Sequence, residues 1–274
     1  MTIVAVILFG IICIWGIGFL MLWFFQDCFL YTRHRVPRKR SRQIAALGAR
    51  VETVAVVVDQ DANVQLRGWW VRNSPLPKAS AILYLGGQGD ELSEWVMRAD
   101  CFGDWSVLFV NYRGYGASDG RPSEARMLAD ALAVYDYLIA RPDVDRDKIV
   151  IMGRSLGTGV ATYLATQRPA VGVILVSPYD SVLQLAQAKL TCFPVERILN
   201  NRYEAITHAP EAKLPLLALL AERDRMIPKR HSLKLIEAWA GPKQVKVIHG
   251  KSHNTIFAGE GYWSSIHEFL NRFC

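Results

Sequence analysis

The chain opens with an uninterrupted apolar run and continues as short apolar stretches alternating with longer amphipathic ones. Residues 2–25 carry no charged side chain, and at about 1.5 Å per helical residue they reach about 36 Å, more than the ~30 Å hydrocarbon core of a bilayer. A cleaved signal peptide would show a basic beginning, a shorter apolar run and a small-residue cleavage site. A buried helix of a soluble protein is rarely so long. The pattern predicts a transmembrane anchor over residues 1–27.

Eight short apolar runs beyond residue 50 are typical of β-strands. The first two, 51–58 and 64–71, are separated by the turn-rich DQDAN and predict a hairpin. The other six are rich in branched residues and end at turn residues, as strands buried on both faces do. They cover 81–87, 107–114, 148–153, 171–178, 214–222 and 244–250.

Helical spacing of apolar residues marks the segments between these strands. Strand–helix alternation indicates right-handed crossovers and a mainly parallel sheet, so we predict one α/β domain over 51–274 with eight strands and helices on both faces. Residues 179–210 interrupt the alternation, and loops of that length usually act as lids. We expect a short cap there, with a surface excursion as the alternative. The helical segments are 90–103, 122–141, 156–168, 229–240 and 261–272.

The formal net charge of +7 arises in one segment. Seven basic residues and no acid lie in the connector 28–50, and without those seven the 32 Lys and Arg fall to 25, equal to the 25 Asp and Glu. This balance leaves no basic face for nucleic acid. Basic residues next to an apolar span favour the cytoplasmic side, so we expect a single-pass membrane protein with its C-terminal domain in the cytoplasm. The same residues would attract anionic headgroups or only set the topology.

Cysteine usage points to no covalent framework. The five cysteines are widely spaced and include no CxxC pair, a pattern that indicates neither a set of disulfides nor a zinc site. We expect no metal and no other cofactor.

One serine stands in a setting that favours nucleophilic chemistry. Ser155 lies in KIVIMGRSLGTGV, between a predicted strand and a predicted helix, and glycines two residues to either side of a serine permit the sharp turn of a nucleophile elbow. Such a serine needs a base and an acid that orients the base, in the chain order Ser, Asp or Glu, His. Asp224 and His253 each follow a later strand, at the same sheet edge as Ser155; Glu222 and His249 are the alternatives.

An oxyanion formed at this serine needs two preorganised donors. The elbow itself supplies the backbone N–H of Leu156. The loop after the third strand, Gly86-Gly87-Gln88-Gly89, should supply the second, and the backbone N–H of Gln88 is the best candidate.

Five motifs together resemble the membrane-anchored branch of the α/β-hydrolase-domain serine hydrolases, which includes lysophospholipases and acyl-protein thioesterases. The resemblance covers about residues 50–272 and implies Ser155 as nucleophile, Asp224 as acid and His253 as base, under a short cap. The family usually has His-Gly-Asn after the third strand, where this chain has Gly-Gly-Gln at 86–88. A backbone donor survives that change, but the side-chain support of the loop is lost. The motifs are NYRGYGASDG (111–120), GRSLG (153–157), SPYDS (177–181), ERDRMIP (222–228) and GKSHN (250–254).

The sequence therefore predicts a membrane-anchored serine hydrolase that cleaves a carboxylic ester or thioester, with a lipid or acylated molecule as substrate. A serine peptidase is one alternative. A catalytically silent hydrolase-fold binding or scaffold protein is another, which the replaced His-Gly-Asn favours and the intact order of Ser155, Asp224 and His253 opposes.

Overall fold

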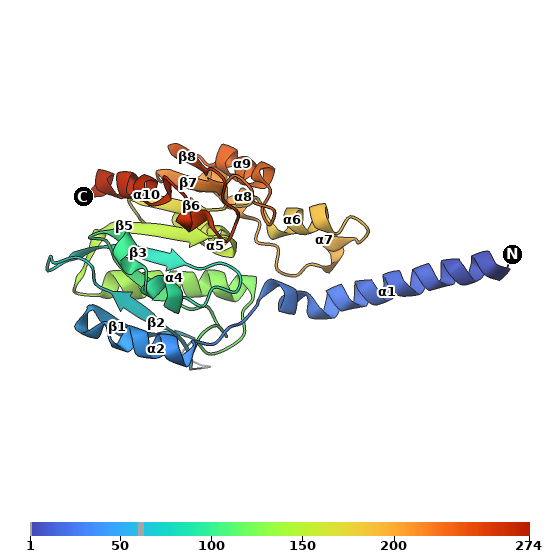
Figure 1. The fold of residues 1–274 in the computed structure, drawn as a ribbon, viewed down its shortest axis with the longest axis horizontal. Coiled ribbons are helices and arrows are strands. Elements are labelled where there is room, and N and C mark those ends of the chain that lie inside the picture. Colours follow the sequence, from blue (N-terminus) through green and yellow to red (C-terminus); the bar gives the residue numbers. More distant parts are fainter. Residues whose placement is uncertain (1, 60–62) are drawn as a thin grey trace.

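One eight-stranded sheet forms the centre of the protein, whose computed structural model describes residues 2–59 and 63–274. The strand order is β1-β2-β4-β3-β5-β6-β7-β8. β2 pairs antiparallel with β1 and β4, and all other neighbours are parallel, so the predicted mainly parallel α/β-hydrolase sheet is confirmed (Figure 1). The strands are β1 (Val51–Asp59), β2 (Val64–Val71), β3 (Ala79–Leu85), β4 (Ser106–Val110), β5 (Val144–Arg154), β6 (Gly172–Val176), β7 (Leu216–Ala221) and β8 (Lys243–Ile248).

Helices cover both faces of the sheet. α4, α5, α8 and α9 contribute to one buried cluster, and α2, α3 and α10 contribute to the other. Successive strand residues point to opposite faces: Leu83 enters the first cluster, whereas Ile82 and Tyr84 enter the second. The helices are α1 (Thr2–Leu30), α2 (Arg38–Ala45), α3 (Ser93–Val96), α4 (Glu124–Ala140), α5 (Leu156–Gln167), α6 (Val182–Lys189), α7 (Val195–Ile198), α8 (Ala205–His208), α9 (Lys229–Ala238) and α10 (Tyr262–Leu270).

The predicted helix over 90–103 is divided in the structure. α3 ends at Val96, and a separate 3-10 turn covers Ala99–Phe102. Arg98, between them, leaves the helical conformation with φ −109° and ψ 8°. Both pieces still bury apolar side chains against the sheet, among them Trp95 and Phe102.

α1 projects away from the sheet, and of the helices between β6 and β7, α6 and α7 lie on the same side of the molecule as α1 (Figure 1). α8 packs against α5 and α9 at the sheet. The apolar window of α1 has a mean hydropathy of 2.8 and none of it is buried. By length and composition α1 can cross a membrane. Its exposed apolar surface therefore calls for a covering of lipid or protein.

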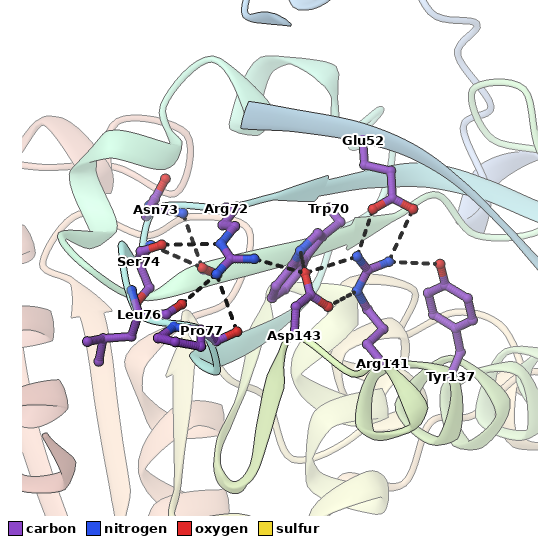
Figure 2. A network of polar contacts seen from close by, with 11 residues as sticks. Glu52, Trp70, Arg72, Asn73, Ser74, Leu76, Pro77, Tyr137, Arg141 and Asp143 are labelled. Carbon is purple, nitrogen blue, oxygen red and sulfur yellow. Dashed lines mark hydrogen bonds and ion pairs between the residues drawn. The ribbon is translucent and has the colours of Figure 1, made fainter. Parts of the chain in front are cut away.

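A polar network joins the β1–β2 hairpin to the start of β5 (Figure 2). Arg141 pairs with Glu52 at 2.7 Å and with Asp143 at 3.0 Å, and its guanidinium lies 5.1 Å from the ring centroid of Trp70. Trp70 Nε1 donates to Asp143 at 3.0 Å. Because β5 runs from Val144 to Arg154, the network lies at the opposite end of that strand from the candidate nucleophile.

We expect Arg141→Met to destabilise the folded domain by about 2 kcal/mol, because the Asp143 side chain, only 20% exposed, loses a charged hydrogen-bond partner. Thermal unfolding of the full chain in detergent should show Tm lower by about 4–8 °C. Arg168→Met is the control, since Arg168 pairs with the half-exposed Asp136 and surface pairs contribute ~1 kcal/mol or less. Equal shifts in the two variants would contradict the expectation.

Candidate active site

Ser155 occupies a sharp turn between β5 and α5. Its backbone adopts φ 49° and ψ −119°, a conformation that L-residues rarely adopt and that costs about 1–3 kcal/mol. A Cβ at Gly153 would meet the carbonyl oxygen of Gly157 at 2.5 Å, and a Cβ at Gly157 would overlap the carbonyl oxygen of Leu85. The two glycines of GRSLG are therefore required by the close approach of α5 to the strand ends.

The ends of β7 and β8 bring Asp224 and His253 to this serine. His253 Nε2 lies 2.9 Å from Ser155 Oγ, and His253 Nδ1 lies 2.8 Å from Asp224 Oδ2. All three side chains are buried. At these distances the imidazole can accept the hydroxyl proton while the carboxylate holds the Nδ1–H tautomer.

The carboxylate of Asp224 is held in its ionised form. Burial alone would raise its pKa, but hydrogen bonds from His253 and from the backbone N–H of Ile227 keep the pKa of Asp224 below its ordinary value. The Asp224 Oδ1 atom accepts the N–H groups of Met226 at 3.0 Å and Ile227 at 2.8 Å. The turn that follows β7 therefore fixes the orientation of the carboxylate.

The two alternative residues pair with each other at the surface. His249 Nδ1 lies 3.0 Å from Glu222 Oε1, and Glu222 also accepts the N–H of Gly250 at 2.7 Å. The His249 side chain is 82% exposed. Neither residue belongs to the hydrogen-bonded chain that includes Ser155.

The predicted oxyanion donors lie beside the same serine. Leu156 is the first residue of α5, and the first N–H groups of a helix have no intrahelical acceptor. The loop after β3 passes close to Ser155, since a Cβ at Gly87 would lie 3.0 Å from the Ser155 Cβ. Leu156 and Gln88 line one cavity together with Ser155.

Arg154 is a site residue that the motif analysis missed. Its Nη1 atom lies 2.9 and 2.8 Å from the two carboxylate oxygens of Asp90, and Nη2 donates to the carbonyl oxygen of His253 at 3.4 Å. Asp90 also accepts the N–H of Gly87 at 2.8 Å. These bonds tie the loop after β3 to the loop of His253, so the chain supports its predicted oxyanion loop by other side chains than His-Gly-Asn. The available signal was a guanidinium at the end of a buried strand, which requires a carboxylate partner.

An apolar cavity of about 470 Å³ opens beside Ser155, a size within the ~300–1,000 Å³ range of ligand pockets. Its walls come from α1, the loop after β3, the cap and the turn after β7. Among the described residues that line it, none carries a carboxylate. The lining residues are Leu22, Gln26, Phe29, Leu30, Gln88, Ser155, Leu156, Tyr179, Val182, Leu185, Ala186, Lys189, Leu190, Leu199, Met226 and Ile227.

Comparison with known proteins places these features in a family. Residues 101–200 match the family model described as "Serine aminopeptidase, S33". Uncharacterized protein Rv2307c of Mycobacterium tuberculosis is 33% identical over 219 residues, which are 78% of this chain and 78% of the relative. Uncharacterized membrane protein YNL320W of Saccharomyces cerevisiae is 27% identical over 95% of this chain and 94% of its own.

A solved structure gives the same result for the fold. The esterase PF2001 of Pyrococcus furiosus superposes with a TM-score of 0.68 at 19% identity, over 88% of this chain and 96% of the esterase. With the relative of 33% identity, the chain belongs to the α/β-hydrolase family. The fold and the family together support a hydrolase activity.

We expect Asp90→Ala to destabilise the protein by about 3–5 kcal/mol, because it leaves the Arg154 side chain, only 9% exposed, as an unpaired buried charge. The double variant Asp90→Ala/Arg154→Met should regain part of this loss, since it buries no charge. Thermal unfolding of the full chain measures both. If the double variant unfolds at or below the temperature of the single variant, the pair does not act through charge.

Proposed function

We propose that the protein is a membrane-anchored serine hydrolase that cleaves the carboxylic ester or thioester of a lipid or other acylated molecule. The observation that carries the proposal is the hydrogen-bonded chain from Ser155 Oγ through His253 to Asp224, at the edge of an apolar cavity. Fold likeness to an esterase agrees with it.

The reaction would proceed through an acyl-enzyme. Ser155 Oγ attacks the acyl carbon as His253 Nε2 takes its proton. The tetrahedral oxyanion then accepts hydrogen bonds from the backbone N–H groups of Leu156 and Gln88. Collapse expels the alcohol or thiol, which receives the proton from His253. A water molecule then gives a proton to His253 and attacks the acyl carbon, and Ser155 is regenerated as the carboxylic acid leaves.

The lining of the cavity favours an acyl chain over a peptide. The family description names a serine aminopeptidase, so peptide cleavage is the second candidate. An aminopeptidase must hold the α-ammonium of its substrate, for which a carboxylate is the usual partner, and the described lining contains none. The lining instead offers aliphatic contacts to an acyl chain, from Leu156, Val182, Leu185 and Ile227.

The anchor and the basic connector support a membrane location. α1 exposes an apolar surface long enough to span a bilayer, and a relative of similar length is described as a membrane protein. The seven basic residues of the connector 28–50 favour the cytoplasmic side and would contact anionic headgroups there. The hydrolase domain would then face the cytoplasm.

We expect Ser155→Ala to abolish labelling by a fluorophosphonate probe and hydrolysis of acyl esters, because the nucleophile is gone. Asp224→Asn and His253→Gln should each lower kcat by at least about 10³-fold, since the base loses its orientation or is absent. Hydrolysis of a panel of esters, thioesters and peptides by the purified full chain in detergent measures these effects.

The paired surface residues provide matched controls for this prediction. His249→Gln and Glu222→Gln likewise remove an imidazole and a carboxylate from the same loops, outside the hydrogen-bonded chain. They should leave kcat within about twofold of the parent, in line with the small effects of surface changes. Retained labelling in Ser155→Ala would refute the serine mechanism, and peptides as the only substrates would favour the second candidate.

We expect a C-terminal tag on the full chain to resist protease added to intact cells and to be digested once the membrane is permeabilised, because the basic connector retains the domain on the cytoplasmic side. An antibody against the tag follows digestion on a blot. Digestion of the tag in intact cells would show the reverse orientation.

A further inference from the structure

The cavity beside Ser155 is walled in part by the anchor helix. Leu22, Gln26, Phe29 and Leu30, from the last turns of α1, line the cavity. The cap contributes further lining residues, chiefly from α6. The membrane-facing helix thus takes part in the same pocket as the candidate nucleophile.

Buried polar contacts hold α1 against the cap. Gln26 is only 8% exposed; its Nε2 donates to the carbonyl oxygen of Ile198 at 3.0 Å, and its Oε1 accepts the N–H of Asn200 at 2.7 Å. Next to it, Asn201 Nδ2 donates to Asp27 at 2.8 Å. Because these bonds are specific in position and direction, α1 has a defined face toward the pocket.

The end of α1 is also joined to the predicted oxyanion loop. The side-chain amide of Gln88 donates to the carbonyl oxygen of Phe29. Gly89 packs next to Thr32 and His34, since a Cβ on Gly89 would lie 3.6 Å from an atom of each side chain. The same loop therefore contacts both Ser155 and the anchor.

The tip of the cap reaches far along α1. Trp15 Nε1 donates to the carbonyl oxygen of Cys192 at 2.8 Å, and the Trp15 and Phe193 rings stack at 5.7 Å. Residues 2–14 alone extend about 20 Å, less than the ~30 Å hydrocarbon core. If α1 spans the bilayer, the part that contacts the cap completes the span, and the cap tip lies within the leaflet.

We propose that the last turns of α1 form one wall of the acyl-binding pocket, and that the substrate is a long-chain acyl ester or thioester resident in the membrane. This inference rests on the function proposed above and adds a specificity role for Leu22 and Phe29. The acyl chain lies between α1 and α6 with its carbonyl at Ser155. A chain already held in the leaflet reaches this gap without crossing water, because the pocket and the cap tip lie along the same helix.

A covalent probe with a reactive chain end tests the position of the acyl chain. Hexadecyl fluorophosphonate carrying a terminal diazirine is reacted with the full chain in vesicles, illuminated, and mapped by peptide mass spectrometry. We expect the head group on Ser155 and the photo-crosslink on residues 15–30 of α1. Labelling of Ser155 with crosslinks only to the sheet or to α9 would overturn the inference and leave the hydrolase function intact. Failure of Ser155 to react would refute the function itself.

A pair of substitutions on α1 tests the same wall by kinetics. Leu22→Trp fills the pocket and should lower kcat/KM for a hexadecanoyl ester about tenfold more than for a butanoyl ester. Leu20→Trp is the matched control, because Leu20 is 53% exposed on the outer surface of α1, and it should preserve the ratio. Reaction with a short-chain fluorophosphonate counts folded sites in each variant. Equal ratios in the parent and both variants would overturn the inference.

Discussion

The parallel pairing of β3, β5, β6, β7 and β8 brings the carboxyl end of each strand to one edge of the sheet. Residues that lie far apart in the sequence therefore come close together at this edge. Ser155 follows β5, Asp224 follows β7 and His253 follows β8. The loop after β3 reaches the same edge. This convergence depends on register, since a shift by one residue would turn every side chain to the other face.

The edge is maintained by close backbone contact as well as by hydrogen bonds. α5 begins immediately after Ser155 and approaches the ends of β3 and β5 so closely that neither Gly153 nor Gly157 has space for a Cβ. The strained conformation of Ser155 persists because the surrounding packing leaves no alternative. The ion pair of Arg154 and Asp90 lies next to this turn, and the bond from Arg154 to the carbonyl oxygen of His253 connects the two loops that flank the serine.

Local sequence patterns were sufficient to predict the strands, and to predict that Ser155, Asp224 and His253 lie close together. Apolar runs such as KIVIM and LLALLA are typical of buried strands, and the turn residues after them show where each strand ends at the sheet edge. Other features depend on tertiary contacts that no local window contains. The division of the helix at Arg98 is one, and the pairing of Arg154 with Asp90 across 64 positions is another. The pocket-facing side of α1 was hidden because Leu22, Phe29 and Leu30 are no more apolar than the residues on the other sides of the helix.

The contacts of Gln26 determine whether α1 can be separated from the hydrolase domain. The buried amide of Gln26 needs its partners at Ile198 and Asn200, and those backbone groups of the cap need the amide in turn. A foreign hydrophobic helix could retain the domain at a bilayer, yet it would leave the two backbone groups unsatisfied and one side of the cavity open. α1 is therefore not interchangeable with another apolar helix, because the Gln26 amide and the backbone groups of the cap are matched to each other in position and direction.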